Sequence, residues 1–224
     1  MKSYKRIHSN QSDNNNKLNK LLLIGIILFC GISMCVVKSN ALHNKEVQQG
    51  IAKEIIRFHV IANSDSASDQ ALKLKVKDKL VKKLSPLLIK ASSIEEARSI
   101  ITKNEDMIQK VATDTIRKNG YDYSVDVSLG ECYFPLKLYG QYSFPPGNYE
   151  ALRVRIGEAK GKNWWCVMFP PLCFVDDTYS VVDKQTNMKL QHLLTKEEYD
   201  SLLLKNEPVH IKFKLWESFK KLFD

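Results

Sequence analysis

An unbroken apolar run near the N-terminus constrains this chain more than any other feature of its sequence. Residues 21–37 read LLLIGIILFCGISMCVV, seventeen residues without a charge, and a lysine stands on either side of them. As an α-helix, at about 1.5 Å per residue, the run measures roughly 26 Å, close to the thickness of a bilayer's hydrocarbon core. Because only a helix satisfies the backbone of a single segment in lipid, we expect a transmembrane segment or the core of a signal peptide.

The residues around this run predict its orientation. Residues 1–20 form a basic and polar cytoplasmic leader, and the stretch 9–19, SNQSDNNNKLN, is typical of disorder. Basic flanks favour the cytoplasm, so the chain after Lys38 should be exported. Ser39 and Ala41 occupy the −3 and −1 positions of a signal-peptidase site. The sequence is compatible with cleavage near Ala41 and with an uncleaved membrane anchor.

The formal net charge of +9 does not indicate a nucleic-acid-binding protein. Residues 1–41 hold six basic residues and one acidic residue, a balance of +5, which leaves +4 for residues 42–224. Most of the excess therefore belongs to the leader, where it favours membrane insertion. We expect the N-terminal segment to contact a membrane and expect no nucleic-acid partner.

After a linker at 38–53, hydrophobic periodicity predicts a domain over residues 54–176. Residues 55–62, IIRFHVIA, favour a strand. Leucine and valine recur every four residues over 68–84, which predicts a helix that Pro86 interrupts. A second helix begins at a capping box of Ser93 and Glu96 and ends at Asn119-Gly120.

The period then changes to two, which indicates strands. Four are predicted, at 121–129, 131–142, 149–156 and 165–169, with Pro135 pushing the second toward an edge or a bulge. A strand, two helices and about four mostly antiparallel strands predict an α+β fold with two layers. Residues 177–224 form an extension with a short helix near 195–204. Its amphipathic end could touch a membrane, although packing on the domain is favoured.

Motifs that mark an enzyme are missing from the sequence. There is no GxSxG, HExxH, P-loop or GxGxxG motif, and no Cys/His cluster has the spacing of a zinc site. His59, Ser64 and Asp65 could be written as a catalytic triad, but helix capping explains the serine and the aspartate without chemistry. We therefore expect that the protein is not an enzyme and that it binds no metal, cofactor or small-molecule substrate.

Three cysteines, Cys132, Cys166 and Cys173, fall in the exported part. Cys166 and Cys173 flank VMFPPL, and a turn at Pro170-Pro171 would bring their sulfurs together. A disulfide closing this loop would stabilise the fold by roughly 2–3 kcal/mol. Two buried free thiols, or a pairing that uses Cys132, are the alternatives.

Four blocks of sequence resemble one family. They are RFHVIANSDS at 57–66 with DQALK at 69–73, FPLKLYG at 134–140, PGNYEA at 146–151, and GKNWWCVMFPPLCF at 161–174. In this order they resemble the stage II sporulation protein R family of endospore-forming bacteria. The resemblance covers about residues 57–174, and nothing transfers to the tail after 177.

The resemblance implies an exported signalling protein. Members are made in the forespore and exported into the space between forespore and mother cell. There they trigger a membrane-embedded aspartic protease that processes pro-sigma-E to the active sigma factor. The family supplies no catalytic residues.

Two surfaces are the candidate contacts with that partner. Aromatic residues are frequent interface anchors, and polar groups at a strand end are poorly explained by core packing, although capping is a rival explanation. The candidates are Arg57, His59, Asn63, Ser64, Asp65, Trp164, Trp165, Pro170 and Pro171. An exported hydrolase acting on cell wall or peptide, and a membrane-anchored wall-binding module, are the alternative functions.

Overall fold

A computed structural model describes the backbone of residues 2–172 and 184–204, and within these ranges the side chains from residue 23 onward. The chain divides into two units, Met1–Gln49 and Gly50–Asp224. The amphipathic C-terminal end and Cys173 lie outside the described residues.

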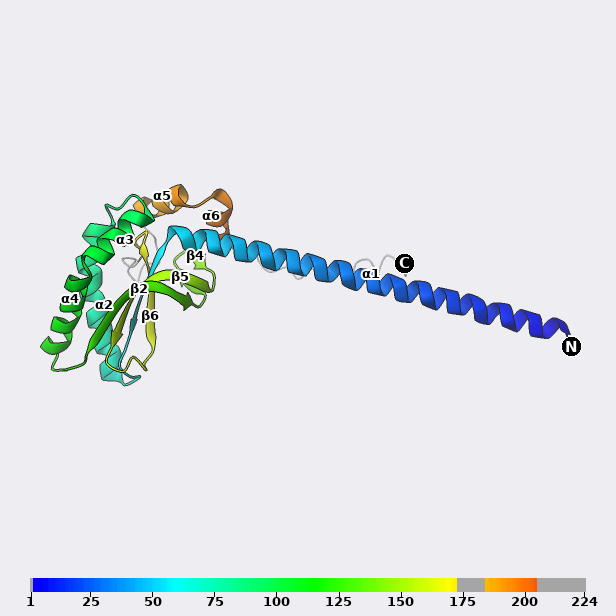
Figure 1. The fold of residues 1–224 in the computed structure, drawn as a ribbon, viewed down its shortest axis with the longest axis horizontal. Helices are drawn as coiled ribbons and strands as arrows, with labels where there is room; N and C mark the ends of the chain where they lie inside the picture. Colours follow the sequence, from blue (N-terminus) through cyan, green and yellow to red (C-terminus); the bar gives the residue numbers. More distant parts are fainter. Residues whose placement is uncertain (1, 173–183, 205–224) are drawn as a thin grey trace. The chain divides into compact units, whose positions relative to one another are not determined.

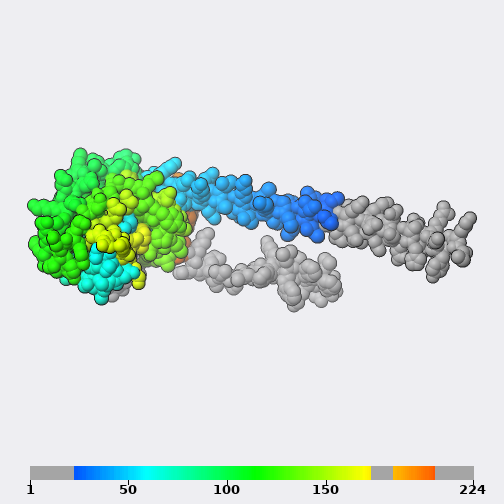
Figure 2. Space-filling view, turned by 60° about the horizontal axis from the view of Figure 1, so that its bottom comes forward, coloured from blue at the N-terminus to red at the C-terminus, as the bar shows by residue number. Residues whose placement is uncertain are grey.

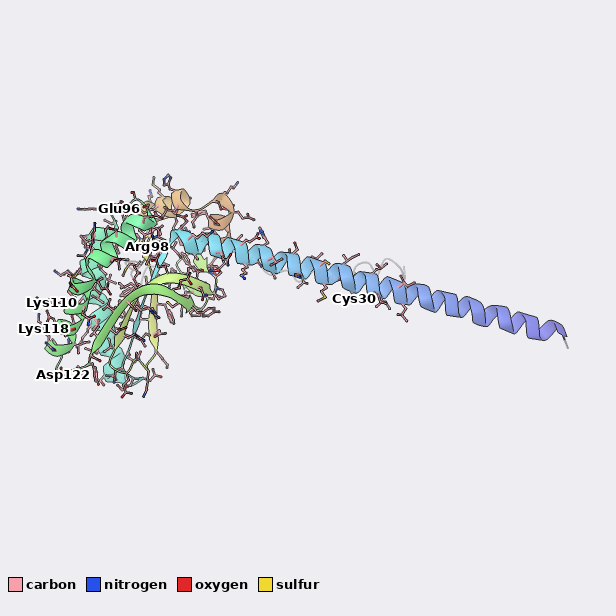
Figure 3. All side chains as sticks on the ribbon, in the orientation of Figure 1. Cys30, Glu96, Arg98, Lys110, Lys118 and Asp122 are labelled. Carbon is pink, nitrogen blue, oxygen red and sulfur yellow. The ribbon has the colours of Figure 1, made fainter. Side chains whose placement is uncertain are left out.

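The first unit is helical. Helix α1, Lys2–Glu54, includes the predicted apolar run and the linker after it (Figure 1). Within it, Leu23–Glu54 is long and apolar enough to cross a membrane, with a mean hydropathy of 1.9 in its most apolar window and none of that window buried. Cys30, labelled in Figure 3, is exposed on this helix. The chain thus has an apolar helix suited to a signal sequence or a membrane anchor.

The stretch 9–19, for which the sequence predicts disorder, lies within α1. No glycine precedes Gly25 and no proline precedes Pro86, so no residue that breaks helices separates this stretch from the apolar run.

The second unit is built on a mixed four-stranded sheet in the order β2-β5-β1-β6. The central strands β1 (Ile56–Ile61) and β5 (Gly147–Ile156) are parallel. The edge strands β2 (Val125–Phe134) and β6 (Asn163–Phe169) run antiparallel to their neighbours. A separate hairpin pairs β3 (Lys137–Tyr139) with β4 (Tyr142–Phe144).

Three helices cover one face of the sheet (Figure 1). They are α2 (Ala67–Leu88), α3 (Ile94–Lys103) and α4 (Glu105–Lys118). The core lies between the two layers, and the predicted stripe of α2 is buried in it: Leu72, Val76, Leu80 and Leu84. Two short helices follow, α5 (Lys184–Leu193) and α6 (Lys196–Leu202). The predicted two-layer α+β fold is confirmed.

Several predicted boundaries are wrong. Pro86 lies inside the last turn of α2 and does not interrupt it. A proline this close to a C-terminal end removes a single hydrogen bond of the helix, and the fully buried Leu88 holds the end in the core. The predicted second helix is two helices, because the backbone at Asn104 leaves helical geometry.

The strands also differ from the prediction. The strand predicted at 121–129 and residues 131–134 of the next predicted strand form the single strand β2, which keeps an unbroken ladder with β5 from Val125–Ile156 to Phe134–Gly147. Pro135, which cannot donate to a ladder, follows its last residue. The rest of the strand predicted at 131–142 is divided between β3 and the start of β4. Helix α5 was missed because Thr186 and Leu190 are its only buried residues, too few for a periodic signal.

Side chains alternate between the two faces of the sheet. Phe58 and Leu152 are paired across β1 and β5 and are buried against the helices. Arg57 and His59 point the other way, toward what we call the outer face. Figure 2 shows that the chain around β6, in yellow, reaches the molecular surface.

Candidate functional site

One line of side chains crosses all four strands on the outer face. Ser128 of β2 is opposite Arg153 of β5, Arg153 is opposite His59 of β1, and His59 is opposite Trp165 of β6. We call these four residues the outer-face row. His59 and Trp165 are two of the sequence-predicted contacts, and the sheet brings them together.

His59 is enclosed, with 5% of its surface exposed. Its ring stacks on Trp165 and meets Phe134 edge-on, with centroids 4.9 and 5.4 Å away. Burial, followed by the charges of Arg153 and Arg57, lowers its pKa to about 4. The imidazole is therefore neutral at neutral pH.

The thiol of Cys132 lies beside His59, with Sγ 3.7 Å from Nε2. Burial raises the pKa of this thiol, although Arg153 and Arg57 oppose the shift. A cysteine nucleophile needs a thiolate and a base or cation that stabilises it. Here the thiol keeps its proton and the neutral imidazole carries no positive charge that would stabilise a thiolate, so the pair lacks the form of an activated nucleophile.

Arg57 is fully buried on the outer face. Its guanidinium carbon is 4.3 Å from the centroid of Phe134 and 5.0 Å from that of Tyr149. Nε donates to the carbonyl of Cys166 at 3.3 Å, and Nη2 donates to the hydroxyl of Tyr139 at 3.2 Å. Nη1 has no hydrogen-bond partner among the residues that the structure describes. A buried charge held by rings and neutral oxygens is costly to keep, because these groups replace hydration incompletely.

Polar atoms without partners gather on this face. Six buried side-chain atoms of the described residues lack a hydrogen bond, and five lie on the outer face: Arg57 Nη1, His59 Nδ1, Ser128 Oγ, Arg153 Nε and Asn163 Oδ1. Each such atom costs about 1–3 kcal/mol of folding stability. Their concentration on one face of one sheet marks it as the candidate functional site.

The loop residues Asn63, Ser64 and Asp65 have a structural role. Asn63 and Ser64 donate to the same oxygen of Asp69, at 2.9 and 2.6 Å. These hydrogen bonds, the one from Ser64 first, lower the pKa of Asp69. Asp65 accepts from the backbone of Lys162 at 2.7 Å. The network joins the start of α2 to the β5–β6 loop.

Lys73 completes the same connection. It is 6% exposed, and Nζ donates to Gln70 Oε1 at 2.6 Å and to the carbonyl of Lys162 at 3.0 Å. Asn63 Oδ1 accepts from the backbone of Glu158 at 2.9 Å. The DQALK block and the NSD turn therefore hold the β5–β6 loop in place.

The remaining sequence-predicted contacts are on other surfaces. Trp164 faces the helices, where it meets Phe58 edge-on at 5.7 Å and lies under Lys77. Pro170 and Pro171 are buried. Cys166 is a buried free thiol in this structure, and its Sγ donates to the carbonyl of Val167 at 3.4 Å. Because Cys173 lies outside the described residues, a disulfide between the two stays a prediction.

Sequence reasoning missed Ser128, Arg153 and Cys132 as parts of the site. A signal was present, because the alternation of 149–156 placed Arg153 on one side with Ala151 and Arg155. What the sequence does not contain is the register that sets Arg153 between Ser128 and His59.

Comparison with known proteins identifies the family. The model of the family Stage II sporulation protein R matches residues 52–179 of this chain, more than half of its length. This chain belongs to the stage II sporulation protein R family. It is also 34% identical over 223 residues to Stage II sporulation protein R of Bacillus subtilis (strain 168), covering 92% of this chain and 100% of that relative.

Family membership implies a role in sporulation and confirms the resemblance drawn from the four sequence blocks. No solved structure matches the chain. The outer-face row and the loop network both lie within the residues that the family model matches. Among the residues that the structure describes, no three His, Cys, Asp or Glu side chains are grouped closely enough to hold an ion.

Proposed function

We propose that this protein is an exported sporulation signal that activates a membrane-embedded aspartic protease of the mother cell, which then processes pro-sigma-E. The observation that carries the proposal is membership of the stage II sporulation protein R family, shown by the family model over residues 52–179 and by the Bacillus subtilis relative over 92% of this chain. The protein would act through contact with the protease and not through chemistry of its own.

The geometry supports a binding role over the alternative of an exported hydrolase. A triad would need His59 to take a proton from Ser64. Instead, His59 contacts Trp165 and Cys132 on the outer face, while the hydroxyl of Ser64 donates to Asp69. Asp65 accepts from the backbone of Lys162. Each of the three residues, His59, Ser64 and Asp65, thus contacts a different neighbour and not another member of the hypothetical triad.

The apolar helix supports export into the space between forespore and mother cell. Basic residues precede the run and favour a cytoplasmic N-terminus, so residues 42–224 would lie outside. The protein would stay anchored there, or be released by cleavage near Ala41. A C-terminal reporter that fluoresces only in the cytoplasm should be dark. A bright reporter would contradict export.

Co-expression tests the signalling role directly. The full chain, the candidate protease and its pro-sigma substrate are produced together in cells that do not sporulate, and processing is followed by the change in size of the substrate. Processing is expected only when all three are present. The controls omit the chain or replace the catalytic aspartate of the protease. Failure of the intact chain to trigger processing by its cognate protease would overturn the proposal.

A further inference from the structure

The outer face carries positive charge that the sheet does not neutralise. Arg155, two residues along β5, is opposite Asp126 and pairs with it at 2.7 Å. Arg98, labelled on α3 in Figure 3, pairs with Glu150 at 2.8 Å. Arg153 is opposite Ser128 and Arg57 is opposite Ala151, and among the described residues neither arginine has an ion pair. Within the described part of the chain, two arginines on one face therefore lack an anion.

Four of the five unpartnered atoms on the outer face share a chemical type, whereas the fifth, Asn163 Oδ1, is an acceptor. Arg153 Nε and Arg57 Nη1 can only donate a hydrogen bond, and Ser128 Oγ can donate one. The neutral imidazole of His59 carries one hydrogen. In the tautomer whose Nε2 accepts from the Cys132 thiol, the ring hydrogen is on Nδ1, so Nδ1 is a donor as well. A group that only accepts hydrogen bonds and carries negative charge would satisfy all four.

Gly130 leaves space beside the outer-face row. Gly130 of β2 and Ala151 of β5 are opposite each other on the same face as Arg153. A Cβ added at Gly130 would have no heavy atom within 4 Å. Arg153 and Trp165 are partly exposed and form the rim over the covered polar atoms.

We infer that the outer-face row is a binding site for a carboxylate, supplied by an acidic side chain of the protein partner. Arg153, Ser128 and His59 would donate to its oxygens, and Arg57 would add positive charge from beneath. A carboxylate is acceptor-only and pairs strongly with guanidinium groups shielded from water. The stacked Trp165 beside it is the type of residue that anchors protein interfaces. This inference rests on the proposed function.

Three single substitutions test the site in the processing assay. Arg153→Gln removes the charge, and Gly130→Thr fills the space with a side chain that suits a strand. Glu131→Thr is the matched control, since it introduces the same residue at the next position, where the side chain is exposed on the opposite face of the sheet. Arg153→Gln and Gly130→Thr should each lower processing by at least about tenfold, because they remove or block one side of a shielded charge pair. Glu131→Thr should stay within about twofold of the wild type.

The same assay separates the two proposals. If the wild type triggers processing and the Arg153→Gln and Gly130→Thr variants trigger it equally well, the carboxylate site is overturned and the signalling role still stands. No processing by the wild type would overturn the signalling role itself. Circular dichroism of each purified variant identifies loss of folding. If Arg153→Gln unfolds, the folded Gly130→Thr variant decides the outcome.

A charge exchange tests the nature of the ligand. Arg153→Glu should abolish processing, and a Lys or Arg in place of one acidic residue on the extracytoplasmic side of the partner should restore it. Restoration only by added inorganic phosphate, or suppressors that replace no acidic residue, would overturn recognition of a protein carboxylate.

Discussion

The imidazole of His59 lies parallel to the indole of Trp165, with ring centroids 4.9 Å apart and an interplanar angle of 5°. Trp164, the preceding residue, points to the opposite face and meets Phe58 edge-on inside the core layer. Adjacent tryptophans thus belong to two different surfaces. Trp165 covers a site of buried polar groups, whereas Trp164 joins the sheet to the helices.

The two tryptophans should respond differently to truncation. Trp164→Ala should lower the free energy of unfolding by about 1–3 kcal/mol, less than the loss of a fully buried tryptophan because Trp164 is partly exposed. Trp165→Ala should leave the domain folded but abolish processing, because it removes the rim of the outer-face row. Thermal melts and the processing assay check both. A folded Trp165→Ala variant with normal processing would show that Trp165 is not a contact.

Stability should depend on pH through His59. Its pKa is about 4 in the folded protein and near its usual 6.5 when unfolded. Between these values the unfolded chain binds a proton that the folded domain does not, so stability is complete above pH 6.5 and falls as the pH drops toward 4. The loss should reach about 3 kcal/mol.

His59→Phe keeps an aromatic ring against Trp165 and removes this titration. Urea unfolding at several pH values should show a smaller slope between pH 4 and 6.5 for this variant than for the wild type. Asp69, whose pKa is lowered, contributes in a lower range, below its usual value of 3.8. A His59 NMR signal that titrates near 6.5, or equal slopes for the two proteins, would contradict the prediction.

Local patterns were enough to predict the fold class. Strand β1, the buried stripe of α2 and the cap at Ser93 all follow from short stretches of sequence, and the structure has Ser93 accepting from the backbone of Glu96. The capping box is incomplete, because the Glu96 side chain accepts from the backbone of Ser92 and not from that of Ser93. Details that depend on one hydrogen bond are beyond a spacing rule.

The site could be predicted only in part, because it depends on strand order. Arg57 and His59 were singled out from one strand, and Trp165 from another. Their meeting with Ser128 and Arg153 requires β5 to lie between β1 and β2, which is a non-local arrangement. Asn63, Ser64 and Asp65 were candidate contacts as well, with helix capping as the rival explanation. The cap of α2 is Ser66, while the side chains of these three residues bind the Asp69 side chain and the backbone of the β5–β6 loop. Their contact with a partner stays a prediction.

The three cysteines after the apolar run should differ in their bonding in the exported protein. Non-reducing peptide mapping should find Cys166 joined to Cys173 and Cys132 free. Cys132 should then react slowly with alkylating reagents at neutral pH, because burial raises its pKa and lowers its thiolate fraction. Alkylation of all three cysteines without a reductant would count against the disulfide.

Two glycines, Gly161 in the β5–β6 loop and Gly130 on β2, offer a test of how the loop network is packed. A Cβ at Gly161 would collide with the backbone carbonyl oxygen of Ser64, and that carbonyl cannot move freely because Gln70 Nε2 donates to it at 2.9 Å. A Cβ at Gly130 would meet nothing within 4 Å.

Gly161→Ala should therefore lower the free energy of unfolding by about 1–3 kcal/mol, the usual cost of forcing atoms into a packed region. Gly130→Ala should be neutral or slightly stabilising, since alanine reduces the freedom of the unfolded chain. Hydrogen exchange should speed up at the amide of Lys162, which donates to Asp65, in the first variant only. Equal stability of the two variants would mean that the β5–β6 loop is not held against the start of α2, and that the NSD turn has a role other than the one its hydrogen bonds indicate.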